Sequence, residues 1–486
     1  MERRTMFRQA RTTLRTLLAA GACAAALGSS AQAGDQPVSN PFGKINHFVI
    51  IYTENRSFDS VFGDFPGADG FAAKQDLAPQ ADFDGTVLKH LPVVRNKKNE
   101  ADARFTAPLA NAAFDLAAFV PPAEKTNDMV HRFYQEQEQI NGGRNDRFAA
   151  VSDAGGLVMG YYQSAGQELA RLARDYTLAD HFHHSAFGGS FLNHIHLICA
   201  CVPRFDNAPA NLIAKLDSAT GFLARTATSP KSTMAGGPDW ENDGAVTPDF
   251  YAVNTLQPVA PPFSDKAPVE ERLPPQTAPT IGDRLSGKGV SWAWYAAGWD
   301  DALSGKLKPY APPENFQPHH QPFNYFAAYA PGSKARSEHL KDGTELMAAI
   351  TSGTLPAVAF YKPIGRDNLH PGYTDLTTGD VHVADVVRSI LAGPNAADTA
   401  IIITADENGG SWDHVAPPKG DRWGPGLRVP TLIVAKLAKH GFVDHTVYDT
   451  MAILKTLTVR FGLAALGTRD ADSPDLRNAF APEAGN

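Results

Sequence analysis

Two pairs of acidic and amide residues, near opposite ends of the chain, could bind a metal ion. Glu54 and Asn55 follow one apolar run, and Asp406 and Glu407 follow another. Brought together, three carboxylates would repel one another strongly unless a cation bound between them. Such oxygen ligands suit Mg²⁺, Ca²⁺ or Mn²⁺ and do not exclude Zn²⁺. The alternative is two separate, solvated strand ends, and the sequence favours a site for one divalent metal ion of unspecified identity.

Ser190 is the candidate nucleophile. It follows Gly188 and Gly189 and opens an apolar run, so residues 177–197 are predicted to form a strand, a turn and a helix. A helix N-terminus offers free N–H groups and a partial positive charge, which suit a phosphate. A metal ion would help to remove the serine proton and stabilise the alkoxide. The alternative role for a serine at this position is a helix N-cap.

Several histidines could meet a bound phosphate. His131, His320, His370 and His414 are predicted in loops or at helix ends, where ligands of α/β sheets bind. A protonated imidazole there would bind phosphate oxygens and could protonate a leaving alkoxide. Ordinary surface or core roles are predicted for His47, His90, His339, His440 and His445.

Apolar runs bounded by polar residues predict the strands that must position these groups. These strands cover residues 45–53, 289–296, 355–362, 399–404 and 429–435. Helices are predicted over residues 127–140, 164–176, 381–391 and 451–461. Strands that alternate with helices favour an α/β fold with a mainly parallel central sheet and helices on both faces. The tail after Thr468 is expected to pack loosely.

Two polar, proline-rich stretches interrupt this alternation. Residues 70–126 and 203–280 show little periodicity, so we expect insertions there, the second of them a possible lid over the site. The two acidic strand ends need one sheet in order to meet. The sequence therefore predicts a single catalytic domain over residues 34–486.

The first 33 residues have the features of a cleaved signal peptide. Five arginines precede an apolar stretch over residues 17–27, and Ala31-Gln32-Ala33 has the small-x-small form of a cleavage site. We therefore expect export to the periplasm or beyond. The cysteines that remain, Cys199 and Cys201, are predicted to be buried free thiols and not a disulfide or a metal site.

Composition excludes several classes of protein. The chain has 486 residues, of which 43% are hydrophobic and 20% charged, so a globular protein with a large core is expected. A net charge of -8 and the lack of a basic patch argue against a nucleic-acid partner. No transmembrane segment is expected in the mature chain.

Three spaced motifs resemble the bacterial phosphoesterase family, which includes acid phosphatases and phosphatidylcholine-type phospholipases C. They are Glu-Asn-Arg-Ser-Phe-Asp at 54–59, Asp-Glu-Asn-Gly-Gly-Ser-Trp-Asp-His-Val at 406–415, and Gly-Leu-Arg-Val-Pro at 426–430. The similarity extends from about residue 45 to residue 463. The resemblance implies an alkaline-phosphatase-like α/β fold and phosphoryl transfer through a covalent phosphoenzyme.

The resemblance also implies roles for individual residues. Ser190 matches the nucleophile, and His131, His320 and His370 match the histidines around the phosphate. A shift of one residue would put His319 in place of His320. The residues that match the metal ligands are Glu54, Asn55, Asp406 and Glu407.

The nucleophile and the residues after the first motif are more similar to those of acid phosphatases than to those of phospholipases C. Phospholipase C members usually have Thr as the nucleophile and follow the first motif with His and a Leu-Gly turn, whereas this chain has Ser190 and continues Ser-Val-Phe-Gly-Asp-Phe over residues 60–65. The first prediction is an exported acid phosphatase that cleaves phosphomonoesters through a phosphoserine intermediate. A phospholipase C is the second, and a non-catalytic binding protein on the same fold is the third. Arg56, Ser57 and Asp59 are expected to hold the turn.

Overall fold

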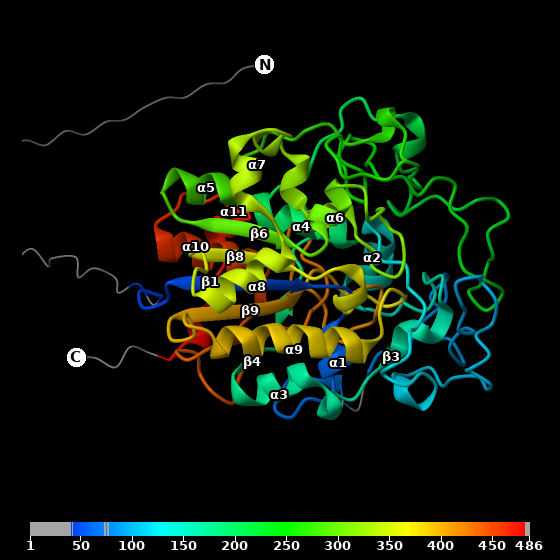
Figure 1. Cartoon of the computed structure of the whole chain (residues 1–486). Coiled ribbons are helices and arrows are strands. Elements are labelled where there is room, and N and C mark those ends of the chain that lie inside the picture. The colour runs from blue at the N-terminus through cyan, green and yellow to red at the C-terminus, as the bar shows by residue number, and fades with distance from the viewer. Residues whose placement is uncertain (1–39, 41, 72–73, 75–76, 482–486) are drawn as a thin grey trace, which may run out of the picture. The chain divides into compact units, whose positions relative to one another are not determined.

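A central sheet of eight strands organises the computed structural model (Figure 1), which describes residues 40, 42–71, 74 and 77–481. Its strands are β1 (His47–Thr53), β4 (Thr177–Ala179), β6 (Trp292–Ala296), β7 (Leu340–Asp342), β8 (Val358–Lys362), β9 (Thr399–Ala405), β10 (Thr431–Ala435) and β11 (Phe442–Asp444). Their order across the sheet is β11-β4-β10-β9-β1-β8-β6-β7. Residues Asn40–Asn486 group into one compact unit.

The middle of the sheet is parallel. β1 lies between β8 and β9 and runs in the same direction as both, whereas β10 is antiparallel to β9 and to β4. Parallel strands have their carboxyl ends at the same edge of a sheet. Glu54, Lys362 and Asp406 therefore come to one edge, and the predicted mainly parallel sheet is confirmed.

Helices cover both faces of the sheet, as predicted. Along β1, Phe48, Ile50 and Tyr52 enter one core, and Val49 and Ile51 enter the other. The first face is covered by α4 (Ser190–Cys199), α5 (Ile281–Gly287) and α10 (Met451–Phe461). The second is covered by α1 (Phe58–Phe62), α3 (Glu168–Asp175), α8 (Gly343–Ser352) and α9 (Leu376–Ala392), of which α8 and α9 lie in front of the sheet in Figure 1.

The remaining elements are short. The helices are α2 (Phe133–Ile140), α6 (Trp299–Leu303), α7 (Lys334–His339) and α11 (Thr468–Asp472), and the outlying strands are β2 (Phe114–Asp115), β3 (Gly160–Tyr161), β5 (Phe182–His183) and β12 (Tyr448–Asp449). The 3-10 helices are η2 (Leu116–Ala118), η3 (Asn141–Gly143), η4 (Gly155–Met159), η5 (Ser164–Gly166), η6 (Ala210–Leu212), η7 (Val269–Glu271), η8 (Pro318–His320), η9 (Pro322–Tyr325), η10 (Ala327–Tyr329), η11 (Gly365–Asp367) and η12 (Leu476–Ala479). The two stretches predicted as insertions are mostly irregular and lie on the right in Figure 1, beyond the carboxyl end of β1.

The four predicted helices are present, and α10 has the predicted bounds, residues 451–461, whereas the bounds of the other three are shifted. The helix expected over residues 127–140 begins only at Phe133, because the N-cap residue Arg132 has an extended backbone with φ -115° and ψ 160°. The helix expected over residues 381–391 begins earlier, at Leu376, where the Asp375 side chain caps it by accepting from the N–H of Thr378.

The prediction of a loosely packed tail is wrong. Helices α11 and η12 both pack against α10. Leu476 and Ala479 are fully buried, and the N–H of Leu476 donates to Thr456 Oγ1 at 3.0 Å. The tail therefore completes the core on the α10 face of the sheet.

The prediction of free thiols is also wrong, because Cys199 and Cys201 form a disulfide. Ala200, between them, ends α4 in the left-handed conformation with a φ of 49°. This turn brings the two Cα atoms to 5.1 Å, which lies within the range that a disulfide can span.

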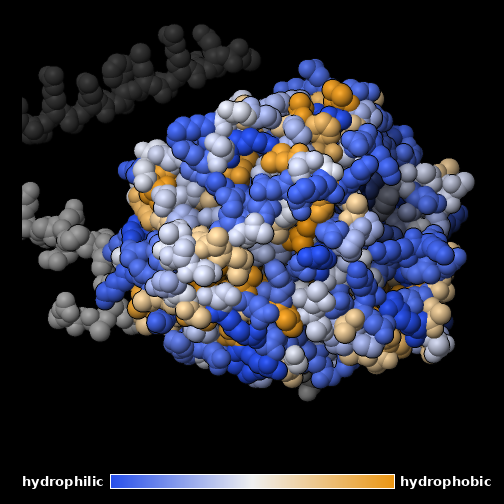
Figure 2. Space-filling view, viewed as in Figure 1, coloured by the Kyte–Doolittle hydropathy of each residue, from blue (hydrophilic) through white to orange (hydrophobic). Residues whose placement is uncertain are grey.

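The predicted signal peptide, residues 1–33, lies outside the described residues. Within the described part of the chain, every helix is too short or too polar to cross a bilayer. In Figure 2, hydrophilic residues dominate the visible face and the hydrophobic ones form small scattered groups.

Candidate active site

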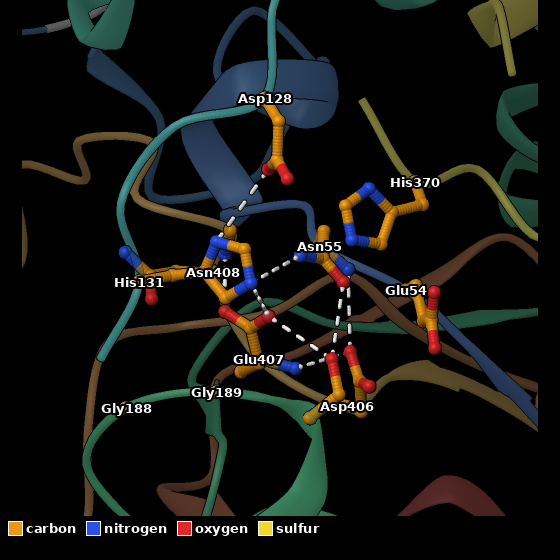
Figure 3. A network of polar contacts seen from close by, with 12 residues as sticks. Glu54, Asn55, Asp128, His131, Gly188, Gly189, His370, Asp406, Glu407 and Asn408 are labelled. Carbon is orange, nitrogen blue, oxygen red and sulfur yellow. Dashed lines mark hydrogen bonds and ion pairs between the residues drawn. The ribbon is translucent and has the colours of Figure 1, made fainter. Parts of the chain in front are cut away.

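The carboxyl ends of β1 and β9 bring the four predicted metal ligands together (Figure 3). Glu54, Asn55, Asp406 and Glu407 are all fully buried. The backbone N–H of Asn55 donates to Asp406 Oδ1 at 3.2 Å, and the N–H of Arg56 donates to the carbonyl of Glu407 at 3.1 Å. The two strand ends are thus bonded to each other. We call Glu54, Asn55, Asp406 and Glu407 the metal cradle.

Ser190 lies next to the cradle and comes from a different element, helix α4. It is the first residue of α4, and Gly189 takes the N-cap position, so the serine side chain is not used as a cap. Ser190 Oγ lies 3.5 Å from Asn55 Oδ1 and 3.5 Å from Glu407 Oε1. The free N–H groups of the first turn of α4 lie beside it and give the site a partial positive charge.

Two glycines permit this close approach. Gly188 has a φ of 86°, and a Cβ there would lie 2.5 Å from the backbone nitrogen of Phe133. Gly409 has a φ of 61°, and a Cβ there would lie 2.6 Å from the Cβ and from the carbonyl oxygen of Asn55. Any side chain at either position would displace the turn that holds Ser190 or the one that holds Asn55.

The cradle has the properties of a cation site. Among the described residues, Glu54 Oε1 and Asp406 Oδ2 accept no well-directed hydrogen bond although both atoms are buried. Burial, with other carboxylates nearby, raises the pKa of Asp406 to about 6 and that of Glu407 to about 8. Three carboxylates and an amide oxygen are ligands that a hard divalent ion prefers. The residues therefore fit the predicted metal ion.

Imidazole nitrogens lie within reach of the same carboxylates. Ligand atoms of Glu54, His319 and His320 lie within 4.8 Å of one another, as do those of Glu54, His194 and Asp406. Nitrogen ligands would suit Zn²⁺ as well as the ions that prefer oxygen. These histidines therefore add nitrogen donors to the oxygen donors of the cradle.

His131 lies next to the cradle. Its Nε2 is 3.2 Å from Asn55 Nδ2 and 3.7 Å from Glu407 Oε1. Burial disfavours the charged form, but the carboxylates of Glu407 and Asp128 outweigh it and raise the pKa of His131 to about 9. His131 can therefore donate a proton at neutral pH.

The other predicted histidines take different positions. His370 lies near His131, with ring centroids 5.8 Å apart, and stacks on Tyr373. Burial lowers the pKa of His370 and that of His320. His320 contacts the Glu54 carboxylate through Nε2, whereas His319 lines the cavity above the site.

A cavity of about 850 Å³ opens over Ser190. His131 and His370 line it next to the nucleophile, and Lys97 and Trp240 come from the two irregular stretches. Both stretches thus contribute to the wall of the pocket that a substrate would enter.

Known proteins identify the family. The Phosphoesterase family model matches residues 45–464. The chain belongs to the phosphoesterase family. It is 24% identical to the non-hemolytic phospholipase C of Pseudomonas aeruginosa over 90% of this chain and 57% of that protein. It is 23% identical to phospholipase C B of Mycobacterium tuberculosis over 92% of this chain and 80% of that protein.

This phosphoesterase spans 57% and 55% of the first two curated relatives, the second being the non-hemolytic phospholipase C of Burkholderia pseudomallei. Among solved structures, a protein of the alkaline phosphatase superfamily from Vibrio parahaemolyticus aligns over 74% of this chain and 75% of its own, with 10% identity and a TM-score of 0.32.

Lys362 is a site residue of this phosphoesterase that the motifs do not indicate. Its Nζ lies 2.9 Å from Glu54 Oε1 and 3.6 Å from Asp406 Oδ2. Burial would raise the pKa of Glu54, but His320 and Lys362 outweigh it and hold that pKa well below its ordinary value. The sequence offered one indication of Lys362, because a charged residue ends the strand predicted over residues 355–362.

A second acidic cluster, which we call the arginine cluster, lies beside the cradle. The fully buried Arg428 donates from Nη2 to Asp59 Oδ1 at 3.0 Å and from Nε to Asp413 Oδ1 at 2.9 Å. His414 Nδ1 lies 2.7 Å from Asp59 Oδ2, which places His414 in this cluster and not in the cavity wall. Ser57 caps α1, so the first motif holds its turn as expected.

Proposed function

We propose that this chain is an exported, metal-assisted acid phosphatase that cleaves phosphomonoesters through a phosphoserine intermediate. The position of the Ser190 hydroxyl supports this proposal most directly. Its Oγ lies 3.5 Å from oxygen atoms of both Asn55 and Glu407, at the start of α4 and in the wall of the large cavity. A nucleophile in that position can reach a phosphate that the cradle and the helix N-terminus hold.

Ser190 carries out the covalent step. A divalent ion bound in the metal cradle would stabilise the serine alkoxide and offset the charge of the phosphate. Ser190 Oγ attacks phosphorus in line, and the bond from phosphorus to the ester oxygen breaks. Water then hydrolyses the phosphoserine, which releases phosphate and restores the hydroxyl.

The histidines supply protons and positive charge. His131, with its pKa raised to about 9, binds a phosphate oxygen and can protonate the leaving alkoxide. His370 has a lowered pKa and becomes charged only at acid pH, where it adds a second cation to the phosphate site. Activity is therefore expected to be higher at acid pH, and a profile that rises steadily above about pH 8 would contradict this assignment.

Replacement of Ser190 tests the nucleophile. Ser190→Ala should lower kcat for p-nitrophenyl phosphate by at least about 10³-fold, because the nucleophile is lost. Circular dichroism should show an unchanged fold. Ser185→Ala is the matched control, since Ser185 is also buried but its hydroxyl makes no hydrogen bond among the described residues. Near wild-type activity in Ser190→Ala would rule out the proposed mechanism.

A phospholipase C is the second candidate, and the curated relatives favour it, because several of them are named phospholipases C. A paired assay separates the candidates. Hydrolysis of p-nitrophenyl phosphate alone supports a phosphatase, and hydrolysis of p-nitrophenyl phosphorylcholine supports a phospholipase C. Hydrolysis of neither substrate by metal-loaded protein supports a binding protein on the same fold.

A further inference from the structure

A buried glutamate and a buried histidine lie beside the turn that leads into Ser190 and have no part in the mechanism above. Glu136 is in the first turn of α2, and His184 directly follows β5. Both side chains are fully buried, and His184 Nε2 lies 2.9 Å from Glu136 Oε1. His184 Nδ1 lies 2.8 Å from the carbonyl oxygen of Ala186. Burial disfavours the charged imidazole, but Glu136 outweighs it and raises the pKa of His184.

The second oxygen of Glu136 binds residues 186–189, which we call the nucleophile turn. The backbone N–H of Gly188 donates to Glu136 Oε2. Gly188 and Gly189 lead directly into Ser190, the first residue of α4 (Figure 3). The described residues that line the cavity include Gly189 and Ser190 but not Gly188 or Glu136. The carboxylate therefore holds the turn from outside the cavity.

The nucleophile turn and α4 form one unit. Asn193 Nδ2 donates to the carbonyl oxygens of Ala186 at 3.0 Å and of Gly188 at 3.3 Å, and Asn193 Oδ1 accepts from the N–H of Ala186 at 3.0 Å. These bonds tie the turn to its own helix. The bond from Gly188 to Glu136 ties the same unit to α2.

Glu136 also joins this unit to the third sequence motif. The N–H of Leu427 donates to Glu136 Oε1 at 3.4 Å, and the N–H of His184 donates to the carbonyl of Leu427 at 3.1 Å. A Cβ on Gly426 would lie 2.3 Å from His184 Nε2 and 2.7 Å from Glu136 Oε1, so any side chain there would separate the pair. One buried carboxylate thus connects α2, the nucleophile turn and the third motif.

A neighbouring glutamate provides a comparison within the same helix. Glu138 is also buried, and its Oε1 accepts from Nη2 of Arg225 at 2.6 Å. The described hydrogen bonds of its side chain include none to the nucleophile turn. The two glutamates therefore share a helix and an ionic partner of their own, but only Glu136 contacts the turn before Ser190.

We propose that Glu136 is a positioning residue that binds the Gly188 N–H and so fixes the place of Ser190 relative to the metal cradle. His184 supports it by holding the other carboxylate oxygen. This inference rests on the proposed role of Ser190 as the nucleophile. A displacement of about 1 Å can lower the rate of a positioned reaction about 100-fold, so the loss of this one anchor is expected to affect catalysis.

Removal of the carboxylate is the first test. With the nitrophenyl substrate that wild type hydrolyses, Glu136→Ala should lower kcat at least about tenfold and slow the single-turnover release of nitrophenolate, because the turn loses its anchor. Glu136→Gln keeps an oxygen for the Gly188 N–H and can donate its amide N–H to a neutral His184. Its kcat should stay within about threefold of wild type. Full kcat in folded Glu136→Ala, or equal losses in the two variants, would overturn the inference.

Glu138→Ala is the matched control, and its kcat should stay within about twofold of wild type even where urea denaturation shows an equal loss of stability in both alanine variants. Equal losses of kcat in Glu138→Ala and Glu136→Ala would overturn the inference, because they would show a general effect of lost ion pairs in α2. If Glu136→Ala does not fold, Glu136→Asp takes its place, since the shorter side chain keeps the charge and withdraws from the Gly188 N–H. Full kcat in Glu136→Asp would then overturn the inference.

Failure of the proposed function gives a different result. An active Ser190→Ala would overturn the phosphoserine mechanism and the inference with it. An inactive Ser190→Ala together with a fully active Glu136→Ala would overturn the inference alone and leave the nucleophile standing.

Discussion

The metal cradle and the arginine cluster take their acidic residues from the same two sequence motifs, but they neutralise the buried charge differently, and the arginine cluster adds Arg428 from the third motif. In the arginine cluster, Arg428 donates to both Asp59 and Asp413. In the cradle, Glu54 Oε1 and Asp406 Oδ2 lack a well-directed hydrogen bond from any described residue. In the first cluster one arginine pairs with both aspartates, whereas in the cradle Lys362 lies near Glu54 and Asp406 and Glu407 has no lysine or arginine partner among the described residues.

This difference shows that close carboxylates alone do not define a metal site. Asp59, Asp413 and His414 also have ligand atoms within 4.8 Å of one another, as a metal site would. The planar guanidinium of Arg428 occupies the space between the two aspartates and matches their geometry. The distinguishing property is the number of buried carboxylates for each buried lysine or arginine, which among the described residues is two for Arg428 in the arginine cluster and three for Lys362 in the cradle.

The largest effect is expected from removing the internal cation. Arg428→Met should lower the free energy of unfolding by about 3–5 kcal/mol, because Asp59 and Asp413 would remain buried without a partner. Urea denaturation measures this change. Arg366→Met is the control, since Arg366 is exposed and pairs with Glu314 at 3.5 Å, and it should cost less than about 0.5 kcal/mol. Similar losses in both variants would contradict the role given to Arg428.

Loss of one ligand should affect only the cradle. Glu407→Gln is expected to weaken Mn²⁺ binding by about 100-fold, because one ligand charge is lost, whereas Asp413→Asn should leave it unchanged. Equilibrium dialysis measures both affinities. If both changes weakened binding equally, the proposed separation of the two clusters would be incorrect.

Metal removal should destabilise the wild-type chain. At a free Mn²⁺ concentration about 100 times Kd, the ion should add about 2.7 kcal/mol to the free energy of unfolding. Calorimetry with and without a chelator measures the accompanying shift in Tm. At the same Mn²⁺ concentration the stabilisation should shrink to about 0.4 kcal/mol in Glu407→Gln and persist in full in Asp413→Asn. A wild-type Tm that is the same with and without the metal would argue against a metal site in the cradle.

The smallest effect concerns pH and the arginine cluster. Burial would lower the pKa of His414, but its hydrogen bond to Asp59 and the charge of Asp59 outweigh this and raise the pKa above 6.5. The stabilisation that protonated His414 contributes to the fold is therefore fully present below pH 6.5. It is lost as the pH rises through the raised pKa of His414. The stability difference between wild type and His414→Gln should be about 1 kcal/mol at low pH and shrink at high pH. A difference that grows with pH would contradict this sign.

The long central strands could be predicted from sequence, and the short edge strands could not. β1 and β9 are seven-residue apolar runs whose polar ends are visible in the sequence. β4, β7 and β11 have three residues each, too few to show a pattern. Helix starts were displaced where the residue before the helix is extended, as Arg132 is, or where a side chain such as Asp375 caps an earlier residue.

The site could be predicted only where residues lie in distinctive motifs. Lys362 resembles any charged residue that ends a strand, and its burial depends on the register of β8 with β1, which the sequence does not specify. His319 and His320 are adjacent in η8, yet one faces the cavity and the other contacts Glu54. The disulfide depends on the left-handed turn at Ala200. An alanine does not indicate such a turn in a sequence, as a glycine would.

The tight fit between Gly409 and Asn55 couples the backbone paths of the two motifs. Because a Cβ at position 409 would lie 2.6 Å from Asn55, neither motif can change its backbone path without the other. A chimera that joins the first half of this chain to the second half of a distant family member would retain both motifs and could still fail to assemble the cradle. The backbone turns of the two motifs therefore have to match, although most of the chain separates them.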